Sequence, residues 1–476
     1  MSSSTTETDS DEPERLISEL VTTAEAAMGR IADYDQSAVD DLVRSVAWGV
    51  YEEERCREIS EVAVGETGLG DVGDKYQKKR RKIAGALDGM LGAETVGVVD
   101  VDEERNLVEI AKPVGVVGAV VPSTNPGATS ILLTMMALKG RNAIILSPSP
   151  RGQSVCELVV DAVHERLESF GAPTDLVQMV PPPVSKDKTY ELMDRVDLLQ
   201  VTGSANNVQA GQESGTPNYC VGKGNPVAFV DETADTEAAA DRIVASKTFD
   251  NSTSCSSEGN AVIVSDVHEE TLAALERRGG YMLDDEQRGR IKDLLFPDGA
   301  GSLNREALAV TPAKLCEMAG INDADAREAD LLLTEGRGVG PQYPLSGEKI
   351  TPVLNVFEVS DFQAGLDLTT DILDYEGAGH SVGLHTRSEG RAVRAGEEIE
   401  VARLLVNQVH CYSNGGHYQN GLGSTLSEGG GTWGGNQLDE NVTYEQFYQT
   451  TTVTRPIEDA TPPDPDSLFA EFMEES

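Results

Sequence analysis

Apolar residues in the first part of the chain recur at the three- and four-residue spacing of amphipathic helices. The stretch AVDDLVRSVAWGVYEEERCREISEVAV, which begins at Ala38, shows this spacing. We therefore expect mostly helices over residues 14–91, after a disordered acidic tail over 1–13. The basic run KYQKKRRK at 75–82 is unusual in so acidic a chain. Two interpretations stay open for it: a solvated helix face, or a surface near an anionic ligand.

The pattern changes at residue 114, where continuous apolar runs alternate with helical stretches. We expect strands at VGVVGAVV, NAIILSPSP, LVQMV and DLLQVTGS, with helices between them. Such alternation indicates βαβ units on a parallel sheet. Ligands of such sheets bind at the carboxyl ends of the strands, where PSTNP, SPSP and TGS fall. No G-x-G-x-x-G motif follows a strand, so this pattern alone leaves the ligand undecided.

A second α/β unit is expected from about residue 235. A helix over DTEAAADRIVASKTF leads to the polar segment FDNSTSCSSE and the strand NAVIV, and the alternation continues to LLVNQV at 404–409. We therefore predict an α/β fold with a first domain over 14–234 and a second domain over 235–410. A Gly-rich return segment over 411–456 and an acidic tail over 457–476 follow. The Gly-rich part is expected to contact a ligand rather than to act as a linker.

Composition narrows the class of protein. The 476 residues carry a net charge of −43, from 81 acidic and 38 basic residues, which argues against nucleic-acid binding. Such acidity with few lysines is similar to that of proteins from salt-loving archaea, in which molar salt screens surface repulsion. None of the six cysteines forms a C-x-x-C pair, so we expect neither a disulfide framework nor a metal site. The acidic start and the lack of long apolar runs predict a soluble cytoplasmic protein.

Cys255 lies among serines and a threonine, whereas a core cysteine prefers apolar neighbours. Small polar neighbours leave room for a substrate, and a helix N-terminus at this point would favour the thiolate. The residues alone leave packing, metal binding, bridging and nucleophilic chemistry open.

Long segments of the chain resemble one enzyme superfamily. KPVGVVGAVVPSTNPGATS, VTGSANNV, FDNSTSCSSE, EGAGHSVGLHT and GTWGGN resemble, in order, motifs of the aldehyde dehydrogenase superfamily, above all its coenzyme A-acylating branch. The resemblance spans roughly residues 20–450. Within the branch, RSVAWGVYEEE, ETGLGDVGDK and KTFDNSTSCSSE are most similar to the enzymes that act on sulfoacetaldehyde. The resemblance to this superfamily implies a Rossmann-like cofactor domain, an α/β catalytic domain, and a protruding hairpin at about 96–112. The segment near 441–456 would join this hairpin in a dimer or tetramer.

The resemblance also implies a covalent mechanism. The Cys255 thiolate would attack an aldehyde carbonyl, hydride would pass to NAD or NADP, and coenzyme A would take the acyl group from the thioester, reversibly. Hydrolytic relatives use a glutamate to activate water, whereas NYCVGKGNPVAFVD at 218–231 has no acid before Asp231. The alternatives are an acylating acetaldehyde or propanal dehydrogenase, a non-acylating dehydrogenase, and a catalytically dead binding protein on this fold.

Catalytic roles follow from the resemblance. Asn125, or Thr124 beside it, would donate a hydrogen bond to the oxyanion together with the Cys255 N–H. His380 would accept the proton of the coenzyme A thiol. Weaker candidates for this role are His410 and His417.

Cofactor contacts are expected at Ser147, Pro148, Thr202, Gly203, Ser204, Gly222 and Glu348. Glu348 would bind the hydroxyls of the nicotinamide ribose, and the small Ser147 would leave space for the 2′-phosphate of NADP. The roles of Cys220 and Lys223, in the segment that contains Gly222, stay open.

Overall fold

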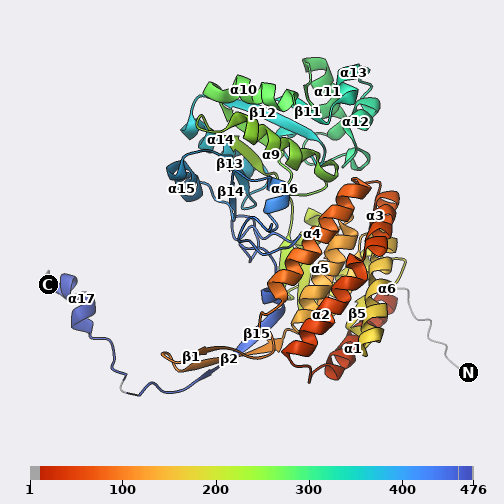
Figure 1. Ribbon diagram of the computed structural model, residues 1–476, viewed down its shortest axis with the longest axis vertical. Helices are drawn as coiled ribbons and strands as arrows, with labels where there is room; N and C mark the ends of the chain where they lie inside the picture. Colours follow the sequence, from red (N-terminus) through yellow and green to blue (C-terminus); the bar gives the residue numbers. More distant parts are fainter. Residues whose placement is uncertain (1–10, 459, 474–476) are drawn as a thin grey trace, which may run out of the picture.

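The computed structural model describes residues 11–458 and 460–473, and two parallel sheets with their helices form its body (Figure 1). The described chain opens with α1 (Asp11–Arg30), α2 (Gln36–Tyr51), α3 (Glu53–Thr67) and α4 (Val72–Met90). These helices confirm the expectation for residues 14–91. Because α1 begins at Asp11, the disorder expected over 1–13 is wrong for residues 11–13, and residues 1–10 lie outside the described residues. The helical spacing buries one face of α2, with Val39, Leu42, Val43, Val46 and Val50 in the core.

The first sheet has the strand order β5-β4-β3-β6-β7, and every neighbouring pair is parallel. Its strands are β3 (Val116–Val121), β4 (Ala143–Pro148), β5 (Val177–Met179), β6 (Leu198–Thr202) and β7 (Asn218–Val221). The helices between them are α5 (Pro126–Lys139), α6 (Gln153–Phe170), α7 (Lys186–Arg195) and α8 (Ala205–Glu213). All residues of β3 and β4 are buried, as in strands covered on both faces. The strand order reverses between β3 and β6, and such a reversal opens a ligand crevice at the carboxyl ends.

The second sheet has the order β10-β11-β12-β9-β8-β13-β14, again with parallel pairs. Its strands are β8 (Val227–Val230), β9 (Asn260–Val264), β10 (Gly280–Met282), β11 (Leu331–Glu335), β12 (Val353–Val359), β13 (Val382–His385) and β14 (Leu404–Val406). The helices of this part are α9 (Thr236–Thr248), α10 (Ser265–Glu276), α11 (Asp285–Leu295), α12 (Pro312–Met318), α13 (Ala324–Glu328), α14 (Phe362–Tyr375), α15 (Glu389–Glu398) and α16 (His410–Ser413).

The domain boundary expected at residue 234 is wrong by one strand. β8 precedes that boundary, yet it pairs with β9 and β13 of the second sheet. The chain passes from one sheet to the other at residues 222–226, where GKGNP interrupts an apolar run. Two glycines and a proline in five residues disfavour a continuous strand, and this break is the physical boundary.

A smaller antiparallel sheet protrudes from the body (Figure 1). β1 (Gly97–Asp102) and β2 (Leu107–Pro113) form the hairpin expected at 96–112, and β15 (Tyr448–Thr454) pairs with β2. The segment near 441–456 thus joins this hairpin within one chain, as expected, whereas the pairing with another subunit stays a prediction. β15 is an edge strand of this sheet in the described chain. Beyond it, α17 (Pro465–Met473) is exposed over residues 465–472.

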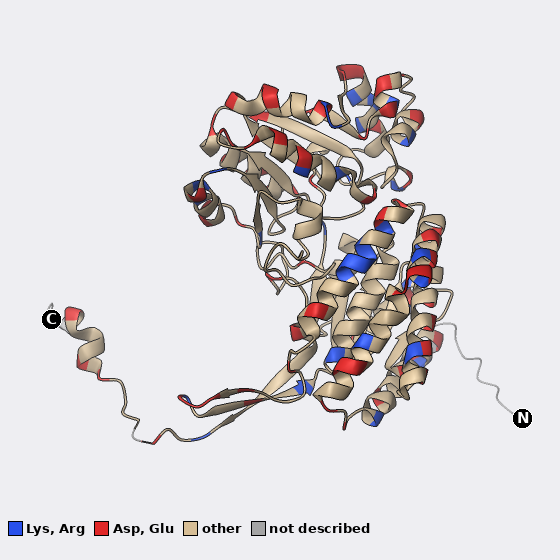
Figure 2. Cartoon of the chain, in the orientation of Figure 1, with Lys and Arg blue, Asp and Glu red and all other residues tan. Residues whose placement is uncertain are grey.

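Charged residues are distributed unevenly over the fold. Figure 2 shows acidic residues along outer helices such as α10, and a basic stretch on α4. α4 packs against the short 3-10 segment Phe249–Ser252, which precedes Cys255. Within residues 11–458 and 460–473, we find no helix that is both apolar and long enough to cross a bilayer.

Candidate active site

Cys255 lies in a turn between α9 and β9. The preceding residues Asp250, Asn251 and Ser252 have positive φ angles of 51°, 48° and 62°. Residues other than glycine rarely adopt this conformation, so the approach to Cys255 is strained. No helix of the described chain begins at Cys255, and the helix N-terminus that would have stabilised a thiolate is therefore missing.

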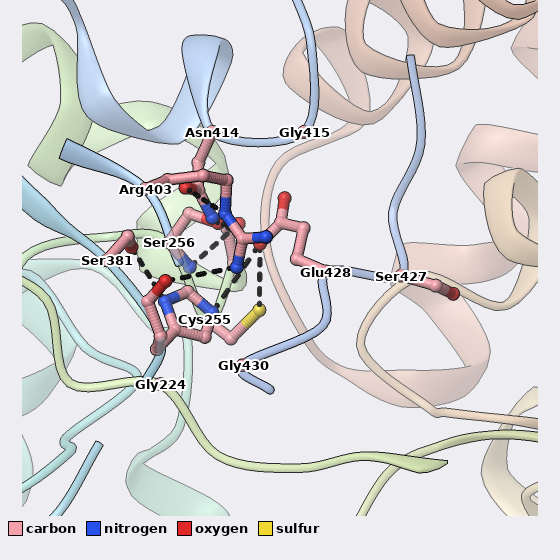
Figure 3. Close-up of polar contacts among 12 residues, drawn as sticks. Gly224, Cys255, Ser256, Ser381, Arg403, Asn414, Gly415, Ser427, Glu428 and Gly430 are labelled. Carbon is pink, nitrogen blue, oxygen red and sulfur yellow. Dashed lines mark hydrogen bonds and ion pairs between the residues drawn. The ribbon is translucent and has the colours of Figure 1, made fainter. Parts of the chain in front are cut away.

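The thiol of Cys255 faces a buried carboxylate. Its Sγ lies 3.7 Å from Oε2 of Glu428 (Figure 3). The same oxygen accepts hydrogen bonds from Oγ of Ser256 at 2.6 Å and Nδ2 of Asn414 at 2.7 Å. Burial, with the charge of Glu428 as the next cause, raises the pKa of the Cys255 thiol well above its usual value. At rest, Cys255 is therefore a thiol that needs a nearby proton acceptor.

Glu428 is held as that acceptor by its neighbours. Burial opposes its ionisation, but the charge of Arg403 and the hydrogen bond from Ser256 keep the pKa of Glu428 below its usual value. Arg403 is itself buried and donates to the carbonyl oxygens of His380 and Gly429, and to Oδ1 of Asn414. The site thus pairs a protonated thiol with an ionised carboxylate.

His380 lies at the start of a chain of hydrogen bonds. Its Nδ1 is 2.7 Å from Oγ of Ser381, which is 2.8 Å from Nε2 of His410. Nδ1 of His410 is buried and has no hydrogen-bond partner in the described structure. Because an unpaired buried N–H costs more than an unpaired lone pair, we assign the proton of His410 to Nε2. His410 then donates to Ser381, Ser381 donates to Nδ1 of His380, and Nε2 of His380 carries the proton that faces Glu428 at 3.5 Å.

The imidazole of His380 is neutral at pH 7, because burial lowers its pKa to about 4. His380 thus reaches the site at Cys255, as expected from the sequence. His410 reaches it through Ser381. His417 does not join this chain of contacts and instead packs against the rings of Tyr412 and Tyr418.

The segment between the two sheets approaches the nucleophile closely at Gly224. A Cβ on Gly224 would lie 2.1 Å from the carbonyl oxygen of Cys255 and 3.2 Å from Nε2 of His380, so only glycine fits. Lys223, whose role the sequence left open, pairs with Glu376 at 2.6 Å. Cys220 is buried in the first core, and burial raises the pKa of its thiol to about 12, which indicates packing rather than chemistry.

Asn125 and Thr124 follow β3, and two lysines of α4 bind them. Nζ of Lys78 donates to Oδ1 of Asn125 at 2.9 Å, and Nζ of Lys75 donates to the carbonyl oxygen of Thr124 at 2.9 Å. Of the two interpretations left open for the run 75–82, the solvated helix face is therefore wrong for its lysines. All four lysines of this run are buried: Lys75, Lys78, Lys79 and Lys82. All four point inward from α4: Lys79 binds α3, whereas Lys75, Lys78 and Lys82 bind Asp250 or the carbonyl oxygens of Gly415 and Gly416.

Most of the expected cofactor residues gather at strand ends of the first sheet. Ser147 and Pro148 end β4, while Thr202 ends β6 and leads through Gly203 and Ser204 into α8. Ser147 is buried, and its hydroxyl lies 2.9 Å from Oγ1 of Thr189 on α7. Thr202 shares a hydrogen bond of 3.0 Å with Ser427, the residue before Glu428.

These strand ends fit a dinucleotide. A Cβ on Gly203 or Gly222 would meet only one neighbouring atom, at 3.8 Å, so the space beside both glycines is open. Ser204 makes no side-chain cap bond, which leaves the first N–H groups of α8 free for a phosphate. Glu348 comes from the second domain, where Oε1 accepts from Gly224 N at 3.0 Å, and burial raises its pKa to about 7. Seven expected residues thus remain candidates for holding a nicotinamide dinucleotide.

Sequence reasoning missed Glu428, Ser256, Asn414 and Arg403. The available signal was a single acid within the Gly-rich segment SEGGGTWGG. Sequence reasoning also missed a candidate metal site. Cys255, His380 and Glu428 each have a potential metal-ligating atom, and these three atoms lie within 4.8 Å of one another, as the ligands of one metal ion do. The expectation of no metal site rested on spacing along the chain, which cannot reveal such a cluster. A metal ion at this position would bind the sulfur of Cys255 and so block its use as a nucleophile.

Comparison with protein families identifies the class of this protein. The family described as the aldehyde dehydrogenase family matches residues 7–280, more than half of the chain. The chain therefore belongs to the aldehyde dehydrogenase family, as the resemblance of its motifs indicated.

Individual relatives narrow the class further. Over 454 residues the chain is 42% identical to the acylating sulfoacetaldehyde dehydrogenase of Cupriavidus necator, which covers 95% of this chain and 91% of the relative. It is 37% identical to the acylating sulfoacetaldehyde dehydrogenase of Bilophila wadsworthia, and the match covers 93% of this chain and 96% of that relative. An acetylating aldehyde dehydrogenase from Geobacillus thermoglucosidasius has the same fold, with a TM-score of 0.91, 30% identity, and coverage of 96% of this chain and 100% of that one. The chain is an oxidoreductase of the acylating branch.

Proposed function

We propose that the protein oxidises sulfoacetaldehyde with NAD or NADP and transfers the acyl group to coenzyme A. Aldehyde, coenzyme A and the oxidised cofactor give acyl-coenzyme A, reduced cofactor and a proton, and the reaction is reversible. The observation that carries this proposal is the Cys255 thiol 3.7 Å from the buried carboxylate of Glu428. The names of the relatives from Cupriavidus necator and Bilophila wadsworthia support the choice of substrate.

Cys255 is the nucleophile of this reaction. As its sulfur attacks the aldehyde carbon, the thiol proton passes to Oε2 of Glu428. Nδ2 of Asn125 and the N–H of Cys255 stabilise the oxygen that becomes negatively charged. Thr202, Gly203, Ser204 and Glu348 would hold the dinucleotide, which when bound would supply the hydride acceptor that converts this adduct to a thioester on Cys255.

The thioester is then passed to the thiol of coenzyme A. Before this step Glu428 releases the Cys255 proton to solvent, so its carboxylate can accept the proton of the coenzyme A thiol, while the neutral His380, with Nε2 3.5 Å from Oε2, holds that carboxylate in place. The Cys255 sulfur then leaves the acyl carbon and takes a proton back from Glu428. Residues 218–230 contain no acid, which supports a thiol rather than water as the acceptor. Because Glu428 could also activate water, formation of the free acid is the outcome that the assay must test.

An anionic aldehyde needs a local cation in a chain of net charge −43. α4 supplies Lys82, whose charge acts on Glu428 and whose Nζ donates to the carbonyl oxygens of Gly415 and Gly416. These two bonds leave one of its three N–H groups without a partner among the described residues. This buried cation favours a substrate with a sulfonate over acetaldehyde or propanal, which remain the competing substrates. The open edge of β15 suits pairing with a second copy, which supports a dimer or tetramer.

The test is formation of reduced cofactor in buffer of high KCl concentration. Sulfoacetaldehyde, acetaldehyde and propanal are compared, with NAD and with NADP, in the presence and absence of coenzyme A. We expect turnover that requires coenzyme A, is fastest with sulfoacetaldehyde, and is absent in Cys255→Ser. Equal turnover without coenzyme A would show a hydrolytic enzyme, and faster oxidation of propanal would refute the sulfonate substrate.

A further inference from the structure

One buried lysine of α4 bonds to both halves of the active site. Nζ of Lys78 donates to Oδ1 of Asn125 at 2.9 Å, to Oδ2 of Asp250 at 2.6 Å and to Oγ1 of Thr253 at 3.0 Å. A lysine ammonium has three N–H bonds, so all of them are used here. Asn125 follows β3 of the first domain, whereas Thr253 lies two residues before Cys255. Lys78 therefore connects the candidate oxyanion donor to the segment that carries the nucleophile.

Asp250 has enough other contacts to hold that segment when one contact is lost. Its carboxylate is fully buried and also accepts from Nζ of Lys75 at 3.1 Å and from the backbone N–H of Asp71 at 2.8 Å. Its own N–H donates to Oδ2 of Asp74 at 2.8 Å. Strained backbone such as that at 250–252 persists only where the surrounding structure fixes it. The nucleophile segment is therefore fixed from several directions, whereas Lys78 is the only described partner of the Asn125 side chain.

The bond to Lys78 decides which way the Asn125 amide faces. An amide has one oxygen that accepts and one NH₂ group that donates, while an ammonium group only donates. Lys78 therefore selects Oδ1, and a rotated amide would set N–H groups against N–H groups. Nδ2 of Asn125 has no hydrogen-bond partner among the described residues, so it is free to bind a ligand atom.

We propose that Lys78 is a positioning residue for the proposed reaction. By holding Oδ1, it keeps Nδ2 of Asn125 directed to the oxygen that becomes negatively charged when Cys255 attacks the aldehyde. This role rests on the proposed function, because it matters only if a carbonyl oxygen is stabilised at this position.

The test compares Lys78→Met with Lys79→Met. Lys79 is the next residue of α4 and is equally buried, but it donates to the carbonyl oxygen of Cys56 at 3.0 Å and to Oγ of Ser60 at 2.9 Å, both on α3. Loss of one oxyanion donor lowers kcat by about 100-fold or more, and we expect a fall of about this size in K78M with little change in the KM for the aldehyde. K79M should keep kcat close to that of the wild type.

Two further measurements separate positioning from a general structural role. Alkylation of Cys255 by iodoacetamide forms no oxyanion, so its rate should stay within about twofold in K78M. On the background of Asn125→Ala, K78M should cause no further loss of kcat, because both changes remove the same hydrogen bond. If K78M does not fold, Lys78→Gln takes its place.

The outcomes are distinct. Equal losses in K78M and K79M, a parallel fall in alkylation, or an additional loss on the N125A background would each overturn the role of Lys78. Wild-type turnover is measured first: a wild type that oxidises no aldehyde refutes the proposed function, whereas an active wild type with an equally active K78M refutes only this inference.

Discussion

Replacing Asp250 with Asn removes one negative charge from the contact between the two domains. The carboxylate of Asp250 is fully buried and lies 2.6 Å from Nζ of Lys78 and 3.1 Å from Nζ of Lys75. Because Asn has nearly the same size, the variant changes charge and not packing. Both ammonium groups would then be buried without their counter-ion.

The size and pH dependence of the effect follow from this geometry. Removing one partner of a buried ion pair costs about 3–5 kcal/mol, because the remaining charge has no partner. At roughly 2 °C per kcal/mol for large domains, the Tm should fall by about 6 °C or more. Burial lowers the pKa of Lys75 to about 8, below its unfolded value, although Asp250 raises it. The charged lysine therefore disfavours folding below pH 8, and this penalty shrinks as the pH rises and the amine loses its proton.

Thermal unfolding followed by circular dichroism at pH 7 and near pH 9 checks both points. Asp241→Asn is a suitable control, because Asp241 is exposed and pairs with Arg278 on the surface, where an ion pair contributes at most about 1 kcal/mol. We expect D250N to be much less stable than D241N at pH 7, with a smaller difference at the higher pH. A D250N Tm no lower than that of D241N, or a deficit that grows with pH, would refute the reasoning.

Three further variants test the site itself. Glu428→Gln should lower turnover at pH 7 by about 100-fold, because the Cys255 proton loses its acceptor. Turnover should recover as the pH rises, since hydroxide then takes this proton. A loss of equal size at every pH would contradict the role of Glu428 as proton acceptor. His380→Ala should slow the coenzyme A-dependent step by about 100-fold. Because the pKa of His380 is about 4, the wild type should show no inflection near pH 6.5, and one that disappears in H380A would contradict a neutral imidazole. Gly224→Ala should abolish turnover, since its Cβ would lie 2.1 Å from the Cys255 carbonyl oxygen, whereas Gly89→Ala on α4, with no atom within 4 Å, should not; an active G224A would show that the segment can move.

The fold was largely predictable because its signals are local. Continuous apolar runs such as VGVVGAVV and NAIILSPSP became β3 and β4, buried over their full length. The domain boundary was missed because β8 continues the apolar character of β7 across only five residues. The apolar run itself predicts that a strand forms. Which sheet the strand joins depends on pairing partners far along the chain, such as Asn260 and Val382 for Val227, or on a break such as GKGNP.

Residues of the candidate site were predictable where a motif surrounds them. Cys255 and His380 stand in such motifs, and the structure brings them together with Gly224 between them. Glu428 could not be predicted, because its importance comes from position rather than from neighbours in sequence. It lies 173 residues from Cys255, and only folding shows that its carboxylate contacts the thiol. Its ionisation depends in turn on Arg403, another distant residue without a motif.

The basic run on α4 shows how composition changes the meaning of a pattern. In an ordinary chain, a cluster of lysines predicts a solvated surface, because an ammonium group is rarely buried. This chain has so few lysines that those it retains are mostly internal; eight of the 13 are buried: Lys75, Lys78, Lys79, Lys82, Lys139, Lys188, Lys247 and Lys349. Each buried ammonium must find oxygen partners, as Lys78 does with Asn125, Asp250 and Thr253. A lysine cluster in such an acidic chain therefore predicts an internal contact rather than a surface, and here that contact joins the two domains at the nucleophile.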